Sequence, residues 1–295
     1  MKRAARGPIR VGISGWRYGP WRGVFYPEKL PQRAELEYAA SHFPSIEING
    51  SFYSLQTPTS YRRWSGDTPD DFVFAVKCPR YITHLRRLRD IDAPLANFFA
   101  SGVLLLQDKL GPLLWQFPPH LKFDLERWSS FLEKLPRSLP AAAVCAQAHD
   151  QRVRSVEWPA SAPRRRLRHA VEIRHDSFRD EAFIKLLRRH EVALVVADTA
   201  GKWPYVEDAT TDFMYLRLHG DKELYASGYS ESALQRWARR IDAWARGGEP
   251  EDAVLIAPHL ARRSFAARAV YCYFDNDIKV KAPFDAQRLR EILGV

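Results

Sequence analysis

Ionisable side chains stand at or just after the ends of several short apolar runs in this sequence. Glu172, Arg174 and His175 close the run HAVEIRH, and Arg217 and His219 close the run MYLRLH. A glutamate and a histidine brought together can exchange protons with a substrate. Arginine side chains can hold an anion through several hydrogen bonds. The types and positions of these residues therefore indicate acid–base chemistry on a bound anion.

Two further runs extend the pattern. Lys77 ends the run FVFAVK, where a buried ammonium is costly unless it meets a carboxylate or a phosphate. Glu47 and Asn49 end the run SIEIN and could orient substrate hydroxyls. The predicted catalytic residues are Glu172, His219, Glu47 and Lys77. The predicted substrate-binding residues are Asn49, Tyr53, Arg80, His84, Gln116, Arg174, His175, Asp198, Arg217, Asp275, Asn276 and Trp16.

Structural interpretations of the same residues stay open. Glu172 and Arg174 could form a closed ion-pair network, and His219 could be a satisfied loop histidine. Asp198 could cap the segment that follows it, and 275–277 could be an Asx-rich turn. The aromatic residues after the first apolar run, from Trp16 on, could plug the fold or offer a stacking platform for a ligand.

Eight short apolar runs that are rich in β-branched residues predict buried parallel strands. They are Ile9–Ser14, Ser45–Asn49, Phe72–Lys77, Pro112–Phe117, His169–Ile173, Ala193–Ala197, Phe213–Leu218 and Ala269–Phe274. Helical periodicity separates them over Leu30–His42, Thr59–Ser65, Leu95–Leu110, Leu125–Leu135, Glu181–His190 and Ser230–Arg246. This alternation predicts one (βα)8 TIM-barrel domain over residues 1–295, with the reactive side chains gathered where the strands end.

One segment, Leu139–Arg168, departs from the alternation because it is rich in alanine, arginine and proline. We expect a surface insertion before the fifth strand, on the side of the barrel opposite the strand ends. A phosphate-binding arm is the alternative. The arginines of this segment supply much of the net charge of +10, which weakens the case for a basic cleft at the strand ends.

Composition limits the class of protein. With 46% hydrophobic residues the chain can bury a large core, and no apolar run is long enough to cross a membrane. The basic N-terminus lacks the apolar stretch of a secretory signal. Three widely spaced cysteines offer neither a disulfide framework nor a metal knuckle. We therefore expect a cytoplasmic protein without a membrane partner, and its oligomeric state stays open.

Seven ordered motifs give a resemblance to a known family. They are GISGWRYGPWRGVFYP, IEINGSFYSLQTP, FAVKCPRYITH, LGPLLWQFPP, VEIRHDSF, YLRLHG and YFDND. Together they resemble the domain of unknown function 72 family, the YecE-like proteins, from Val11 to Leu289 with the 139–168 segment interrupting the match. The resemblance implies a TIM barrel and the same residues at its mouth. It implies no particular reaction.

Three functions are compatible with these observations. The first is an enzyme for a small anionic or polyhydroxylated, phosphosugar-like substrate, and no cofactor is predicted for it. The second is a metal-dependent phosphodiesterase or nucleic-acid-processing protein of the endonuclease-IV type, with a divalent metal bound by carboxylates and histidines; Lys77, Arg174 and Arg217 would oppose that metal. The third is a non-catalytic barrel that binds a ligand or RNA. The site interpretation requires Glu47, Lys77, Glu172, Arg217 and His219 to project into one solvent-reachable hollow.

Overall fold

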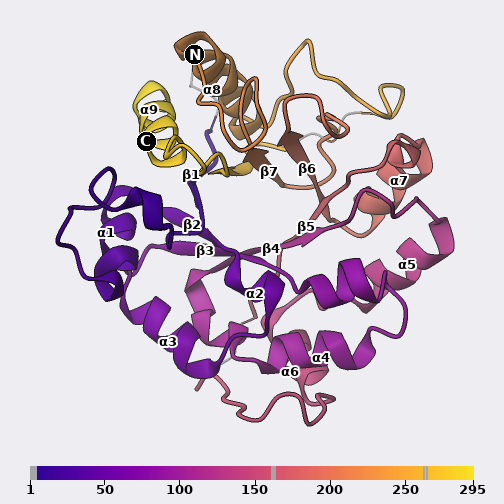
Figure 1. Cartoon of the computed structure of the whole chain (residues 1–295). Coiled ribbons are helices and arrows are strands. Elements are labelled where there is room, and N and C mark those ends of the chain that lie inside the picture. The colour runs from indigo at the N-terminus through magenta and orange to yellow at the C-terminus, as the bar shows by residue number, and fades with distance from the viewer. Residues whose placement is uncertain (1–4, 161–163, 262, 264) are drawn as a thin grey trace.

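The computed structural model describes residues 5–160, 164–261, 263 and 265–295. Its eight strands are all parallel, pair in sequence order and close into a barrel where β8 meets β1 (Figure 1). They are β1 (Ile9–Ser14), β2 (Ser45–Ile48), β3 (Val73–Lys77), β4 (Leu110–Gln116), β5 (His169–Glu172), β6 (Ala193–Asp198), β7 (Phe213–Leu218) and β8 (Ala269–Phe274). The predicted TIM barrel is confirmed.

Helices surround the strands (Figure 1). They are α1 (Glu35–His42), α2 (Gly50–Tyr53), α3 (Pro58–Gly66), α4 (Asp92–Ala100), α5 (Leu125–Lys134), α6 (Leu139–Ala146), α7 (Glu181–Arg189), α8 (Glu231–Ala245) and α9 (Ala282–Leu293). Side-chain caps fix where several begin, because each accepts a hydrogen bond from an otherwise unpaired backbone N–H. Thr57 caps α3, Asp124 caps α5, Asp180 caps α7 and Ser230 caps α8.

The predicted helix Leu95–Leu110 is wrong in its second half. Helix α4 ends at Ala100, and a 3-10 turn over Val103–Lys109 leads directly into β4. Gly102 makes the break, with a φ of 106° that disfavours any residue carrying a Cβ. A Cβ at this position would lie 2.6 Å from the Cα of Pro58. The close approach of α3 therefore decides where α4 stops.

The predicted surface insertion is also partly wrong. Its first residues form α6, which packs against α4 and buries Leu139, Ala142 and Ala146. The segment then reaches the side of the barrel where the strands end, because Arg152 lies 5.8 Å from the ring centre of Tyr81, just after β3. The segment returns to the start of the strands before β5, and its residues 161–163 lie outside the described residues.

The barrel interior is filled by the side chains that alternate inward along each strand. They form an apolar cluster of small and aromatic residues: Val73, Ala75, Leu114, Ala170, Ala193, Val195, Ala197, Phe213, Tyr215, Ala269, Tyr271 and Tyr273. The residues two positions further along β3, β4, β5, β7 and β8 must then face inward as well. These positions carry the polar residues that the sequence singled out. No helix within the described ranges is long and apolar enough to cross a bilayer.

Candidate functional site

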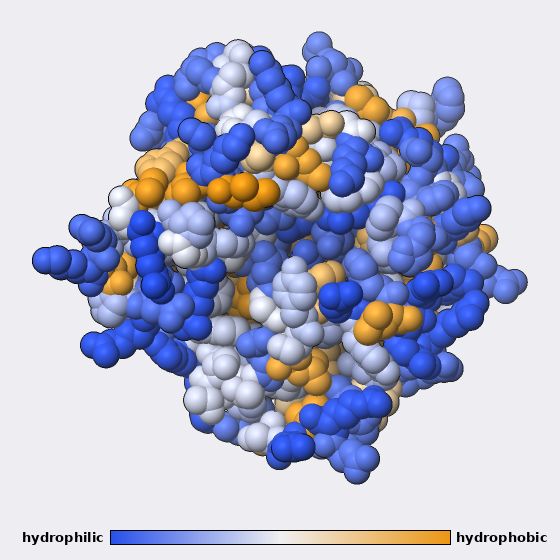
Figure 2. All heavy atoms as spheres, in the orientation of Figure 1, coloured by the Kyte–Doolittle hydropathy of each residue, from blue (hydrophilic) through white to orange (hydrophobic). Residues whose placement is uncertain are grey.

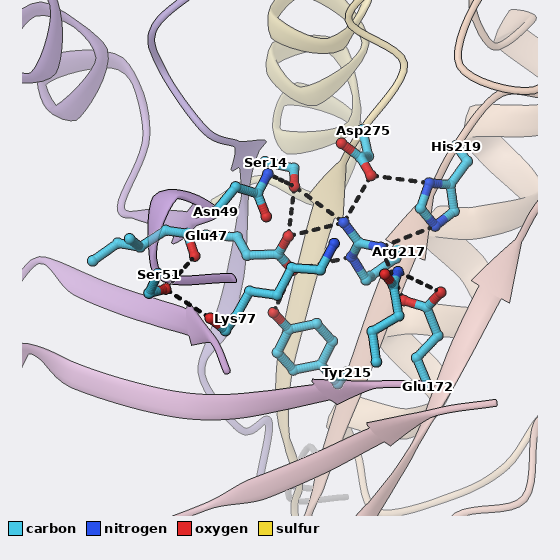
Figure 3. A network of polar contacts seen from close by, with 12 residues as sticks. Ser14, Glu47, Asn49, Ser51, Lys77, Glu172, Tyr215, Arg217, His219 and Asp275 are labelled. Carbon is cyan, nitrogen blue, oxygen red and sulfur yellow. Dashed lines mark hydrogen bonds and ion pairs between the residues drawn. The ribbon is translucent and has the colours of Figure 1, made fainter. Parts of the chain in front are cut away.

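The inward alternation places a polar layer directly above the apolar filling of the barrel. Lys77 stands two residues after Ala75, and Arg217 stands two residues after Tyr215. The neighbouring strands contribute carboxylates and amides at the same level, so that side chains from far apart in the sequence converge (Figure 3). Parallel strands in a closed barrel all end on one side, which is why this layer forms there.

Arg217 lies at the centre of this layer and binds three carboxylates. Its Nη2 lies 2.9 Å from Oε1 of Glu47 and 2.7 Å from Oδ2 of Asp275, and its Nη1 lies 2.9 Å from Oε2 of Glu172. The side chains of Arg217, Glu47 and Glu172 are fully buried. Burial opposes the charge of Arg217, but the three carboxylates outweigh it and hold the pKa of Arg217 well above its usual range.

Glu47 is held by neutral hydroxyl groups as well as by Arg217. Its Oε2 accepts a 2.6 Å hydrogen bond from Tyr215 Oη, and its Oε1 accepts a 2.5 Å hydrogen bond from Ser14 Oγ. Asn49 in turn donates to Ser14 Oγ at 2.9 Å. Ser14 and Tyr215 were not predicted as site residues. The only sequence signal for them was their inward register, at the end of β1 and two positions before Arg217 on β7.

Glu172 binds a second arginine on the side facing away from Arg217. Oε1 of Glu172 accepts hydrogen bonds from Gln116 Nε2 at 2.9 Å and from Arg174 Nε at 2.8 Å. The guanidinium of Arg174 also stacks 3.7 Å from the ring centre of Trp203. Burial would raise the pKa of Glu172, but Arg174 and Arg217 outweigh it and hold that pKa well below its usual range. Glu172 is therefore an ionised carboxylate that fixes both arginines.

His219 lies beneath the surface, between two members of the same network. Its Nδ1 lies 3.1 Å from Oδ2 of Asp275, and its Nε2 lies 3.4 Å from Nη1 of Arg217. Burial and the cation of Arg217 lower the pKa of His219, although Asp275 acts in the opposite direction. His219 is therefore a neutral imidazole that positions Asp275.

The expectation that five residues share one solvent-reachable hollow is wrong for four of them. Glu47, Glu172, Arg217 and His219 have 0% exposed surface. They converge as expected, but they lie below the floor of the mouth. Both carboxylate oxygens of Glu47 and of Glu172 already accept hydrogen bonds from donors of the same layer (Figure 3). Only Lys77 of the five lines open space.

A cavity of about 740 Å³ opens above this floor. The face of the molecule that carries it is hollowed near its centre, with hydrophilic residues inside the hollow and apolar patches around it (Figure 2). Nine predicted site residues line it: Trp16, Asn49, Tyr53, Lys77, Arg80, His84, Gln116, Arg174 and Asp275. Residues that the prediction of the site omitted also line it, among them Arg17, Tyr18, Phe52, Gln56, Trp64, Tyr225 and Asp277.

Lys77 is the buried cation of this cavity. It is 8% exposed, and its Nζ lies 4.3 Å from the ring centre of Phe52. No described residue places a hydrogen-bond acceptor or a carboxylate within bonding distance of that nitrogen. Burial and the charge of Arg217 lower the pKa of Lys77 to about 8.

Two other groups that face the cavity have shifted pKa values. Burial and the nearby Asp275 carboxylate raise the pKa of Asp277 to about 6. Burial and the charges of Arg174 and Lys77 lower the pKa of His84 to about 4, and His84 is hydrogen-bonded to Thr83 at 2.8 Å. At neutral pH, His84 is therefore uncharged and Asp277 is mostly ionised.

Three predicted residues lie outside the cavity and have local partners. His175 accepts a hydrogen bond from the backbone N–H of Ser177, Asp198 accepts one from Tyr229 Oη, and Asn276 donates to Asp285. The metal hypothesis needs ligands from six residues, which are Glu47, Glu172, His175, Asp198, His219 and Asp275. Within the described parts of the chain, no group of three His, Cys, Asp or Glu side chains is arranged to hold a metal ion. Arg217 occupies the place between the carboxylates instead.

Comparison with known proteins gives the family. The model of the family described as "Protein of unknown function DUF72" matches residues 10–295. UPF0759 protein YunF of Bacillus subtilis is 34% identical over 116 residues, which are 38% of this chain and 40% of that protein. UPF0759 protein YecE of Escherichia coli K12 is 30% identical over 129 residues, 43% of this chain and 44% of that protein. These matches therefore span less than half the length of the curated relatives.

Solved structures agree over almost the whole chain. A crystal structure of a DUF72 family protein from Thermotoga maritima superposes with a TM-score of 0.74 at 26% identity, covering 98% of this chain and 100% of that chain. A DUF72 family protein from Enterococcus faecalis has a TM-score of 0.68 at 16% identity, covering 97% and 96%, and shows the fold alone. The seven ordered motifs, the closed barrel and the match over residues 10–295 lead to one conclusion: this chain belongs to the DUF72 family.

Proposed function

We propose that this protein is an enzyme that binds a small organic anion in the cavity above the Arg217 layer. The observation that carries the proposal is the Lys77 ammonium in the cavity wall. Lys77 is only 8% exposed, and its nitrogen has no hydrogen-bond acceptor among the residues that the structure describes. A buried ammonium in this position is costly unless a ligand supplies the missing anion. The size of the cavity suits a ligand such as a phosphorylated sugar.

The rest of the cavity wall supports an organic anion over an inorganic one. Arg80 and Arg174 add positive charge, and Trp16, Phe52 and Trp64 present apolar ring surface. Such rings stack against the apolar faces of sugars and other flat groups, while arginines hold carboxylates or phosphates. Asn49 and Gln116 provide amide groups at the floor for hydroxyl groups of the ligand.

Proton exchange is assigned differently from the first expectation. Glu172 and His219 are sealed in the floor, whereas Lys77 and Asp277 face the cavity with pKa values of about 8 and about 6. Groups whose pKa values lie on the two sides of neutrality can act as acid and base at physiological pH. We therefore assign the acid–base role to Lys77 and Asp277, with Glu172 and His219 as positioning residues.

A ligand-stabilisation screen tests the proposal. Inorganic phosphate, glycerol 3-phosphate and ribose 5-phosphate would be added to the wild type, to Lys77→Met and to Lys185→Met. The last is a control that removes the same charge from the exposed face of α7. We expect an anion at about 100 times its Kd to stabilise the wild type and the control by about 2.7 kcal/mol. Equal stabilisation of Lys77→Met would contradict the proposal.

Nucleic-acid binding is the second candidate, and a separate groove favours it. This groove of about 550 Å³ lies on the loops after β3 and β4, and five cations line it: Arg86, Arg87, Arg89, Lys122 and Arg127. Two carboxylates, Asp90 and Asp124, line it as well. Binding through such cations would weaken steeply with salt. A titration of single-stranded RNA at two salt concentrations, with Arg87→Ala/Arg89→Ala as the variant, tests this candidate.

The three cysteines bear on where the protein works. Cys78 and Cys272 are buried free thiols, and Cys145 is a partly exposed one. Free thiols persist in a reducing compartment, which supports the cytoplasm as the location we propose.

A further inference from the structure

We infer that the anion bound in the cavity carries an aldehyde or ketone group and that Lys77 forms a Schiff base with it. The inference rests on the proposed function and deepens it, because it names the substrate class as carbonyl compounds bearing a carboxylate or a phosphate. Two structural features carry it. The first is the nitrogen of Lys77, which has no hydrogen-bond acceptor among the described residues. The second is Asp277, which lines the same cavity as Lys77.

The nitrogen of Lys77 is free to act as a nucleophile. Lys109, another buried lysine of this barrel, donates from Nζ to the carbonyl oxygens of Ser65 at 2.6 Å and Thr68 at 2.8 Å, which hold its nitrogen in place. Lys77 has no such acceptor within the described chain, and its Nζ lies over the Phe52 ring. Both lysines are buried, but only the nitrogen of Lys109 is hydrogen-bonded. Of the two, Lys77 is therefore the one that can attack a ligand.

The surroundings of Lys77 raise the fraction of the neutral amine that attack requires. Burial and the guanidinium of Arg217 both disfavour the ammonium, whereas Glu47, Asp275 and Glu172 favour it. Arg217 already binds all three of those carboxylates. With a pKa of about 8, about a tenth of Lys77 is neutral at pH 7, several hundred times the fraction of an ordinary lysine. Desolvation together with a neighbouring cation is a known way to activate a lysine towards carbonyl groups.

Asp277 supplies the proton that the condensation needs. The Nζ lone pair of Lys77 forms a bond to the carbonyl carbon, and the C=O π electrons move to oxygen. The proton released from nitrogen neutralises that oxygen and gives a carbinolamine. Its C–O bond then breaks and the nitrogen lone pair forms the iminium. The protonated fraction of Asp277, about a tenth at pH 7 with a pKa of about 6, donates to the departing hydroxide to give water. Each step is neutral in redox terms and needs no further reactant.

Arg174 provides the contact for the anionic group of the ligand. Its Nε and Nη2 are held by Glu172 at 2.8 Å, and its plane stacks on Trp203 at 3.7 Å. A guanidinium fixed on one edge still presents its remaining N–H groups to the cavity, where they can pair with a carboxylate or a phosphate. The ligand would then span from Arg174 to Lys77.

Reductive trapping tests the inference. Wild-type protein would be incubated at pH 7 with glyoxylate or dihydroxyacetone phosphate and then with sodium borohydride, and the modified lysine located by peptide mass spectrometry. Glycolate and glycerol 3-phosphate, which lack an aldehyde or ketone group, are the matched ligands. We expect labelling of Lys77 at least about 10 times faster than of any exposed lysine, because its neutral fraction is larger. Lys109 is expected to stay unlabelled.

Two variants separate this inference from the proposed function. Lys77→Arg keeps the cation and cannot form an imine, so it should retain stabilisation by glycerol 3-phosphate and lose trapping. Asp277→Asn should slow trapping by about 100-fold and retain that stabilisation. Stabilisation of the wild type without trapping at Lys77 would overturn the Schiff base and leave the anion site standing. Trapping that proceeds equally fast at exposed lysines would also overturn it. If the wild type shows no stabilisation and no trapping, both proposals are overturned.

Discussion

Arg217 and Glu47 are joined by two hydrogen bonds, from Nε to Oε2 at 3.1 Å and from Nη2 to Oε1 at 2.9 Å, across a separation of 170 positions in the sequence. Both side chains are fully buried. Such a pair, once desolvated, depends on each partner to offset the cost of burying the other. Asp275 and Glu172 complete the surroundings of the guanidinium, so the network couples β2, β5, β7 and the end of β8.

Replacement of the central cation should therefore be severe. In Arg217→Met, Glu47 and Asp275 would lose their guanidinium partner and Glu172 would keep only Arg174. We expect the free energy of unfolding to fall by about 3–5 kcal/mol. Urea denaturation at pH 7 measures this loss. Arg288→Met, which removes an exposed arginine paired with Glu231, is the control and should unfold like the wild type. A variant of Arg217 as stable as the wild type would show that the network is dispensable.

Replacement of Lys77 should instead raise the free energy of unfolding. Because the folded pKa of Lys77, about 8, lies below the value in the unfolded chain, the ammonium destabilises the folded state at pH 7. Lys77→Met should then be more stable than the wild type by up to about 3 kcal/mol at pH 7. The difference should shrink as the pH rises from 8 towards 10.5, where the wild type folds with a neutral amine. Denaturation at pH 7, 8.5 and 10 checks both the sign and the window.

Glu172 should make the wild type sensitive to acid. Its folded pKa lies well below the usual carboxyl range, so its contribution to stability is present above the unfolded pKa and is lost as the pH falls. Glu172→Gln should cost about 3 kcal/mol at pH 7 and much less at pH 3. Denaturation is compared at these two pH values, with the partly exposed Glu181→Gln as control. A cost independent of pH would contradict the ionised state.

Gly102 should tolerate no side chain. Its φ is 106°, and a Cβ at this position would lie 2.6 Å from the Cα of Pro58. Gly102→Ala should therefore destabilise the protein by about 2 kcal/mol or more. Gly19→Ala is the matched control, because a Cβ at Gly19 would meet nothing within 4 Å. Thermal unfolding of the two variants provides the measurement, and equal midpoints would refute this account of the end of α4.

The barrel and the identity of its polar layer could be predicted from the sequence because both follow from short-range patterns. Because side chains alternate along a strand, Lys77 points inward like Ala75, and Arg217 points inward like Tyr215. Eight apolar runs separated by helices form a parallel sheet that closes into a barrel. The sequence by itself therefore determined the barrel and many, but not all, of the residues that converge at its mouth.

Only the tertiary structure decided whether a given side chain is sealed below the cavity or lines it. Glu172 and Lys77 have similar sequence surroundings, yet one is sealed by Gln116, Arg174 and Arg217 and the other lines the cavity. Pairing across the barrel depends on strand stagger and on the reach of each side chain, which no local pattern encodes. The same reason explains why Asp277 was not predicted to line the cavity and why His175 caps a turn: a loop residue is placed by contacts with other segments.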